Sequence, residues 1–163
     1  RISEVASVRK VWAFDYSQGM LENAKASKLV SYFRADAQHI PVANSVVDLV
    51  SIGFGIRNIE DVDQALKECH RVLAQKGRIL ILEFGQSDSP IINYVFRIYS
   101  KYVMPLLGWV ATGNFEAYRY LQSSSEKFPC GKNFCRILEK NGFRNVSQIQ
   151  LFFGLAYIYQ GDR

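Results

Sequence analysis

Short apolar runs alternate with amphipathic segments along this chain, a pattern typical of a parallel sheet covered by helices. Four runs have the length and composition of buried strands: Val11–Phe14, Ser31–Ala35, Val46–Ile52 and Ile79–Leu82. Parallel strands need crossover connections, so the segments between them are expected to be helical. The pattern predicts a doubly wound, mostly parallel α/β sheet.

Two of these connections carry helix signals. Ser17 is expected to cap a helix that turns Met20 and Leu21 inward. Asp61 is expected to cap a second helix, which Gly77 closes. Apolar residues recur in the second helix at spacings of three and four, which predicts one buried face. They are Val62, Ala65, Leu66, Cys69, Val72 and Leu73.

The pattern changes in the second half of the chain. An aromatic, apolar stretch without a strand period follows Gln86, and we predict helices there. A further helix is expected over Asn133–Asn141. Little more than Gly154 separates two strand candidates, Arg144–Gln150 and Phe152–Tyr159, so we predict an antiparallel pair at the sheet edge.

Composition narrows the class of protein. A chain of 163 residues with 48% hydrophobic residues has the size and core of one domain. Its net charge of +5 is scattered instead of forming a basic stripe, so a generic basic surface is favoured over a nucleic-acid partner. The three cysteines and two histidines lack metal-ligand spacing, which predicts reduced thiols and no metal site.

No signal peptide is expected, because residues 1–10 lack an apolar core. Ile91–Val110 is the stretch apolar enough to test as a membrane span. Arg97 and Lys101 near its middle would each cost about 2.5–3.5 kcal/mol at a bilayer centre, and Pro105 interrupts it. We predict that it does not span a membrane.

The run Ser51–Asn58 brings two glycines, a cation and an amide to the point where the third predicted strand ends. Open α/β sheets bind their ligands at this end of their strands. Gly53 and Gly55 permit positive φ and close approach of a ligand. Arg57 and Asn58 supply hydrogen-bond donors. The alternative is a strand that ends in a glycine turn with Arg57 solvated.

Acidic residues end the other predicted strands. Asp15 suits a carboxylate that accepts hydrogen bonds from two ribose hydroxyls, and a helix-capping aspartate is the alternative. Asp36 and Ala37 lie where an adenine amine could be met by an acceptor. Glu83 is expected either to cap a loop or to approach a substrate.

Several motifs together resemble one family. They are Asp15-Tyr16-Ser17-Gln18-Gly19-Met20-Leu21, Asp36-Ala37, Phe54-Gly55-Ile56-Arg57-Asn58, Arg71-Val72-Leu73 through Gly77-Arg78 to Glu83-Phe84, and Glu116-Ala117-Tyr118-Arg119-Tyr120-Leu121. From about Val11 to Gly161 the chain is similar to the ubiquinone/menaquinone biosynthesis C-methyltransferases of the UbiE type, which depend on S-adenosylmethionine. The resemblance implies a Rossmann-like methyltransferase domain with an antiparallel edge strand.

The resemblance also implies a cofactor site. Asp15 would hold the ribose of S-adenosylmethionine, and Met20 would pack against the nucleoside. Asp36 and Ala37 would contact the adenine. Gly53 matches a position that is often serine in such enzymes, so only a backbone contact is implied there.

On the substrate side, the resemblance implies a polyprenyl quinol. Arg57 and Asn58 would face the reacting ring, and Tyr118 with Tyr120 would belong to the substrate pocket. Residues 87–128 would form a helical lid inserted in a single domain that spans residues 1–163. The implied location is cytoplasmic with peripheral membrane contact, or the matrix side in a mitochondrion, and a homodimer or a biosynthetic complex stays open.

The chain departs from the family pattern at three places. The usual Lys-Pro-Gly-Gly turn is Ala74-Gln75-Lys76-Gly77, and a serine expected after Phe84 is Gly85. No first strand and glycine-rich loop precede Val11, so the chain resembles the carboxyl-terminal two thirds of such an enzyme. We therefore expect either a gap between the first and third predicted strands or direct pairing of the two.

A quinol that loses a hydroxyl proton has a nucleophilic ortho carbon, so catalysis would need in-line positioning and stabilisation of phenolate charge. Arg57 suits the second task, because a guanidinium stays charged and donates in a fixed fork. A water, Glu83 or a carboxylate from outside the chain would take the proton. The alternatives are a small-molecule O- or N-methyltransferase, a noncatalytic membrane-associated binding module, and a dinucleotide oxidoreductase.

Overall fold

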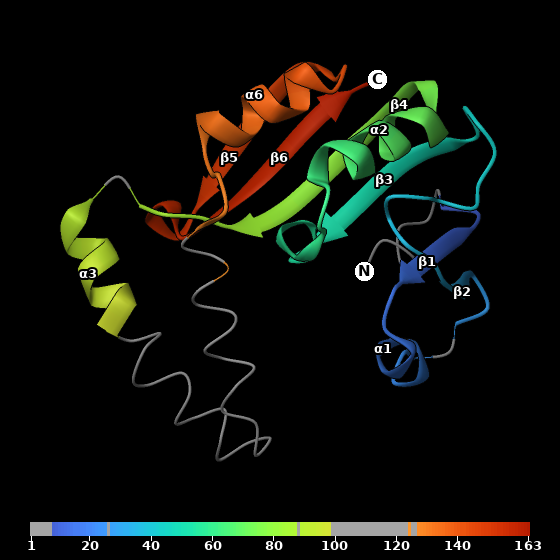
Figure 1. The fold of residues 1–163 in the computed structure, drawn as a ribbon, viewed down its shortest axis with the longest axis horizontal. Coiled ribbons are helices and arrows are strands. Elements are labelled where there is room, and N and C mark those ends of the chain that lie inside the picture. The colour runs from blue at the N-terminus through green and yellow to red at the C-terminus, as the bar shows by residue number, and fades with distance from the viewer. Residues whose placement is uncertain (1–7, 26, 88, 99–123, 125–126) are drawn as a thin grey trace.

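The computed structural model describes residues 8–25, 27–87, 89–98, 124 and 127–163, and the predicted alternation of strands and helices is confirmed (Figure 1). In chain order, with η for a 3-10 turn, the elements are β1 (Val11–Asp15), α1 (Gln18–Glu22), β2 (Val30–Arg34), β3 (Val47–Gly53), η2 (Ile56–Asn58), α2 (Val62–Val72), β4 (Leu73–Phe84), α3 (Pro90–Ile98), α6 (Lys132–Lys140), β5 (Arg144–Leu151), η4 (Phe152–Gly154) and β6 (Ala156–Asp162).

β1 and β2 form a parallel pair that is separate from the larger sheet. Their register runs from Val11 opposite Val30 to Asp15 opposite Arg34. Among the described residues, no strand ladder joins this pair to the other four strands. Of the two arrangements expected for β1 and β3, the gap is therefore the one observed.

The larger sheet has the strand order β3-β4-β6-β5. β3 and β4 are parallel, with Gly53 opposite Leu82, whereas β6 runs antiparallel to both β4 and β5. The predicted antiparallel pair is confirmed. Its antiparallel member, β6, lies second from the edge, and β5 is the edge strand.

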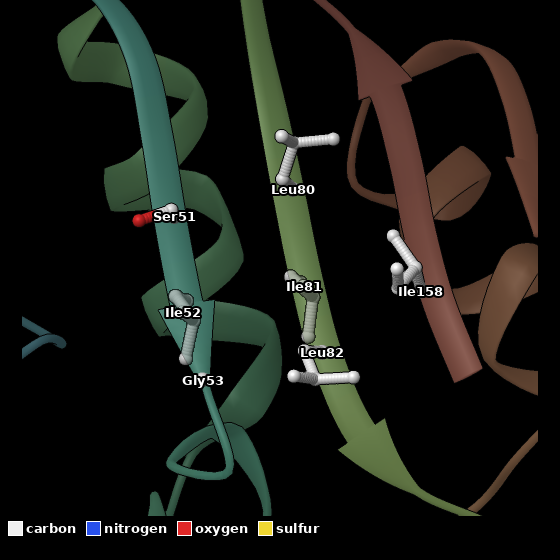
Figure 2. Close-up of a pocket in the computed structure, with 7 residues that line it drawn as sticks. All are labelled: Ser51, Ile52, Gly53, Leu80, Ile81, Leu82 and Ile158. Carbon is white, nitrogen blue, oxygen red and sulfur yellow. The ribbon is translucent and has the colours of Figure 1, made fainter. Parts of the chain in front are cut away.

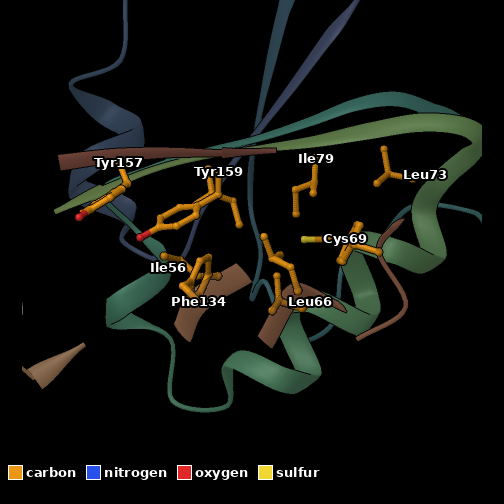
Figure 3. Packing of buried hydrophobic residues seen from close by; sticks show 11 residues of the cluster. Ile56, Leu66, Cys69, Leu73, Ile79, Phe134, Tyr157 and Tyr159 are labelled. Atoms are coloured by element: carbon orange, nitrogen blue, oxygen red, sulfur yellow. The ribbon is translucent and has the colours of Figure 1, made fainter. Parts of the chain in front are cut away.

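One face of this sheet packs against α2 and α6, and the core lies between them (Figure 3). Side chains alternate along a strand, so Ile79 and Ile81 of β4 face the helices and are fully buried. They meet side chains from both helices and from β6, namely Leu66, Cys69, Phe134, Leu138, Tyr157 and Tyr159. The predicted buried face of α2 is thus confirmed.

Helix ends follow the local sequence in part. The Asp61 carboxylate accepts a hydrogen bond from the Gln64 amide at 2.9 Å, which confirms the predicted cap of α2. The prediction that Gly77 closes α2 is wrong. The helix ends at Val72, because Leu73 adopts an extended conformation and begins β4. Gly77 lies inside β4, where an added Cβ would meet Leu73 Cδ2 at 2.9 Å.

Two other local predictions need correction. Met20 does not turn inward: its side chain is 64% exposed, and none of the five residues of α1 is buried. The last strand begins at Ala156 and not at Phe152. Phe152 and Phe153 both adopt positive φ, at 48° and 58°, and this conformation interrupts an extended strand.

α3 confirms the predicted helix at the start of the aromatic stretch. Its first turn is fastened by Asn93, whose side chain accepts from the Ser87 amide at 2.8 Å and donates to the Ser87 carbonyl. No helix among the described residues is long and apolar enough to cross a bilayer.

Candidate functional site

The ends of β1 and β2 meet because the two strands are parallel. The Ala35 amide donates to the Asp15 carbonyl at 3.2 Å, so Asp15 and Asp36 lie at neighbouring strand ends. Oδ1 of Asp15 accepts the Ser17 amide at 2.8 Å, while Oδ2 has no partner among the described residues. The Asp15 carboxylate therefore caps the turn into α1 and keeps an oxygen available to a ligand.

Gln38 fixes the Asp36 carboxylate. Asp36 Oδ1 accepts the Gln38 backbone amide at 2.8 Å, and the Gln38 side-chain nitrogen lies 3.2 Å from each carboxylate oxygen. These bonds, the backbone one foremost, lower the pKa of the Asp36 carboxyl and keep it charged at neutral pH. Gln38 Oε1 also accepts the Asp61 amide at 3.2 Å, which ties the loop after β2 to the cap of α2.

Arg71 holds the part of the loop after β2 that contains Ile40 and Val42. Its guanidinium donates to the carbonyls of Ile40 and Val42, both at 2.8 Å, and pairs with Glu68 at 2.7 Å. Glu68 in turn accepts the Ile40 amide at 2.9 Å. Because α2 carries both charged residues, the loop that bears Asp36 is fixed to the helix that follows η2.

β3 leads into η2 through a strained residue. The residue with positive φ is Phe54, at φ 54°, whereas Gly55 has φ −111°, so the freedom that the glycines offer is not used in this way. Two contacts hold Phe54 in this conformation: its amide donates to the Leu82 carbonyl at 2.8 Å, and its ring packs 4.5 Å from that of Phe84. Non-glycine residues with positive φ concentrate at functional sites.

Arg57 is buried beside the end of β4, and its side chain is only 6% exposed, which excludes the solvated alternative. Nη1 donates to Glu83 Oε1 and to the Phe54 carbonyl, each at 2.6 Å. Nε donates to Ser124 Oγ at 3.3 Å, and the guanidinium carbon lies 5.4 Å from the centre of the Phe84 ring. Four independent contacts therefore set the direction of one cation.

The two glycines at family positions differ in their surroundings. An added Cβ on Gly53 would meet nothing within 4 Å, so the backbone there is open to a ligand and a serine would also fit. An added Cβ on Gly85 would lie 2.4 Å from the Tyr157 ring, so a serine would require that ring to move. This contact explains why the chain has glycine after Phe84.

These residues fit S-adenosylmethionine. Asp15 offers an acceptor for ribose hydroxyls, and Asp36 offers a charged acceptor for an adenine amine. Gly53 offers open backbone, and Met20 offers an exposed apolar side chain. Among the described residues, no three His, Cys, Asp or Glu side chains gather as metal ligands would.

A shallow hollow of about 280 Å³ lies on the sheet face opposite α2 (Figure 2). Seven residues line it, namely Ser51, Ile52, Gly53, Leu80, Ile81, Leu82 and Ile158. Its lining is mostly apolar and includes Gly53, but it contains neither the acidic strand ends nor the buried cation. We therefore assign the chemistry to the strand ends and not to this hollow.

The structure brings Asp15 and Asp36 to neighbouring strand ends, and Gln38 ties the Asp36 loop to Asp61, the cap of the helix that follows the Arg57 turn. Asn58 follows on that turn, is exposed and donates its amide to the Gly55 carbonyl at 3.0 Å. The predicted substrate residues Tyr118 and Tyr120 lie outside the described residues.

Sequence reasoning missed two contributors to this site. Gln38 follows the Asp36-Ala37 pair directly, and that adjacency was the available signal. Ser124 lies 67 residues after Arg57, and no local pattern indicates their contact.

Comparison with known proteins agrees with the motifs. The model of the ubiE/COQ5 methyltransferase family matches residues 2–163. The chain is 39% identical over 133 residues to ubiquinone/menaquinone biosynthesis C-methyltransferase UbiE of Bdellovibrio bacteriovorus, covering 81% of this chain and 57% of that protein. It is 37% identical over 159 residues to the mitochondrial 2-methoxy-6-polyprenyl-1,4-benzoquinol methylase of Homo sapiens, covering 93% of this chain and 49% of that protein.

A third relative is covered more fully. Demethylmenaquinone methyltransferase of Thermus thermophilus is 38% identical over 167 residues, covering 99% of this chain and 76% of that protein. A solved methyltransferase dependent on S-adenosylmethionine, from Thermotoga maritima, shares the fold at a TM-score of 0.66 and 15% identity, covering 91% of this chain and 71% of that one. The chain spans about half the length of the Bdellovibrio and human relatives. The chain belongs to the ubiE/COQ5 methyltransferase family.

Proposed function

We propose that this protein, at its natural length, transfers the methyl group of S-adenosylmethionine to a ring carbon of a polyprenyl quinol. Its relatives carry names for this kind of reaction on ubiquinone and menaquinone precursors. The observation that supports the proposal is a pair of acceptors, Asp15 and Asp36, at neighbouring strand ends, together with a cation, Arg57, that is held in place just after β3.

Asp15 accepts hydrogen bonds from the ribose hydroxyls, and Asp36 with Ala37 meets the adenine. Met20 covers the nucleoside, which accounts for an apolar side chain that is 64% exposed. Gly53 approaches the cofactor through its backbone, where nothing lies within 4 Å of its missing Cβ. When bound, S-adenosylmethionine would supply the methyl group from its sulfonium, leaving as S-adenosylhomocysteine, and the methylated ring carbon would then lose its proton.

The substrate ring lies beside Arg57 and Asn58. Loss of a hydroxyl proton from the quinol gives a phenolate whose ortho carbon is the nucleophile. Arg57 stabilises the phenolate oxygen, since a guanidinium that is already oriented does not need to reorganise as charge develops. Asn58 lies on the same turn, and its side-chain amide orients the ring.

A lid over residues 87–128 of a single domain, with Tyr118 and Tyr120 in the substrate pocket, stays a prediction, since most of this range lies outside the described residues. The described part of the lid, α3, exposes an apolar stripe with helical spacing: Ile91, Tyr94, Val95 and Ile98. A polyprenyl tail resides in a bilayer, so this stripe suits peripheral contact with a membrane, on the matrix side if the protein is mitochondrial.

The test is product identification. The purified natural-length protein is incubated with S-adenosylmethionine that carries a labelled methyl group. The second substrate is a polyprenyl quinone, either reduced or oxidised. We expect label on a ring carbon of the reduced substrate only, as located by NMR. Label on a hydroxyl oxygen would favour the O-methyltransferase alternative, and no transfer to any quinol would overturn the proposal.

A further inference from the structure

Glu83 is a carboxylate with no exposed surface at the end of β4. Oε1 accepts from Arg57 Nη1 at 2.6 Å and from the Phe84 amide at 2.9 Å. Oε2 accepts from the Arg57 amide at 3.4 Å. The carboxylate therefore holds both the backbone and the side chain of Arg57.

The other contacts of the guanidinium leave one nitrogen available. Nη1 donates to Glu83 and to the Phe54 carbonyl, and Nε donates to Ser124. Within the described part of the chain, Nη2 has no hydrogen-bond partner, and it carries two N–H donors. A guanidinium fixed on two of its three nitrogens presents the third in one direction.

We infer that Glu83 is a positioning residue, which orients Arg57 so that Nη2 donates to the quinol oxygen, and that Glu83 is not the base. The inference rests on the proposed function for the identity of that oxygen. A general base must lie within hydrogen-bond reach of the proton it removes. Glu83 is enclosed by its three donors and has no exposed surface, so the base is a water or another group.

The experiment uses Glu83→Gln, Arg57→Lys and their double variant in the protein at its natural length. Asp162→Asn is the matched control, because Asp162 pairs with Arg78 at 2.8 Å at the other end of β4 and both side chains are partly exposed. Three quantities are measured. They are the single-turnover rate of methyl transfer to a reduced polyprenyl quinol, the affinity for S-adenosylmethionine, and the NMR signal of the Arg57 Nε–H, assigned by its loss in Arg57→Lys.

For Glu83→Gln we expect a rate at least about tenfold lower, cofactor affinity within about twofold of wild type, and a shifted or broadened Nε–H signal. Since Glu83 acts through Arg57, adding Glu83→Gln to Arg57→Lys should cause no further loss of rate. Asp162→Asn should leave the rate, the affinity and the Nε–H signal unchanged.

Three results would overturn the inference. A folded Glu83→Gln variant with wild-type rate would make Glu83 merely structural. A slower variant whose Nε–H signal is unchanged would make Glu83 a base, and additive losses in the double variant would give it an independent role.

Two other outcomes are also decisive. If Glu83→Gln does not fold, Glu83→Asp provides the same readouts, because it keeps the charge and is shorter by one methylene. If the wild-type protein methylates no quinol, the proposed function fails, and the Nε–H signal alone decides whether Glu83 orients Arg57.

Discussion

In the proposed site, Asp15 has a structural and a binding role in one side chain. Its Oδ1 closes the turn into α1 by accepting the Ser17 amide at 2.8 Å, and its Oδ2 stays available at the end of β1. The two interpretations of this residue, helix cap and ribose acceptor, are therefore compatible, because a carboxylate has acceptor sites for both.

We predict that Asp15→Ala weakens binding of S-adenosylmethionine more than tenfold and changes quinol binding far less. Loss of a charged hydrogen bond costs about 1.5–3 kcal/mol, which corresponds to that factor or more. Calorimetric titration of the natural-length protein measures the effect. Asp48→Ala is the control, because Asp48 is an exposed carboxylate near the start of β3. Equal cofactor affinity in the wild type and Asp15→Ala would remove Asp15 from the site.

The sequence predicted the positions of the candidate residues at the ends of strands, because backbone direction alone decides them. Asp15 and Asp36 lie at the neighbouring ends of the parallel pair β1 and β2, and the Arg57 turn follows β3. The environment of Arg57 was not predictable. Its partner Glu83 lies 26 residues away, and a contact between two side chains depends on packing that no local period encodes.

Contacts at both ends of α2 fasten it to the end of α6 and to the residue before β5. Asp63 on α2 accepts hydrogen bonds from Lys140 and Asn141, both at 2.7 Å, and these lower the pKa of its carboxyl. His70, in the last turn of α2, packs edge-on against Phe143 at 5.3 Å between ring centres. α2 thus connects the loop that carries Asp36 to the end of α6 and to Phe143.

His70 predicts a pH dependence of stability. Burial, and secondarily the charge of Arg163, lowers the pKa of His70 below its usual 6.5. The unfolded chain then binds the proton more readily than the folded one, so this contribution to stability is present above about pH 6.5 and is lost as the pH falls below it. We expect His70→Gln to reduce the stability difference between about pH 7.5 and about pH 5.5 in urea unfolding. An unchanged difference would contradict this assignment.

The prediction of helices and strands succeeded where apolar residues recur at a regular spacing over several turns. Five of the six apolar residues predicted at helical spacing lie in α2, and its capping aspartate is confirmed, whereas the sixth, Leu73, begins β4. It failed at short elements whose conformation depends on their neighbours. α2 ends where Leu73 pairs with Val47, and η4 forms where Phe152 and Phe153 take positive φ, and neither event has a sequence signal of its own.

At the scale of the whole molecule, no strand among the described residues pairs with both β1 and β3. Strands of a parallel sheet are usually paired on both sides and covered on both faces, yet Trp12, Phe14 and Leu49 are each more than a third exposed. Unpaired backbone groups in a buried strand cost about 1–3 kcal/mol each. We therefore propose that a further strand lies between β1 and β3 in the natural-length protein.

Hydrogen exchange tests this proposal. Amides on the facing edges of β1 and β3 should exchange rapidly in a protein limited to residues 1–163 and slowly in the natural-length protein. The shorter protein should also bind S-adenosylmethionine weakly. Rapid exchange in both proteins would mean that no strand fills the gap.

The most direct measurement is single-turnover methyl transfer at saturating S-adenosylmethionine, comparing natural-length wild type with Arg57→Lys. The variant keeps the charge but loses the fork that contacts Glu83, Phe54 and Ser124. We predict transfer of the label to the ring carbon of a reduced polyprenyl quinol by the wild type, and a rate at least about tenfold lower in the variant with cofactor affinity unchanged. Equal rates in the two proteins, or no transfer by the wild type, would contradict a methyl transfer that depends on Arg57.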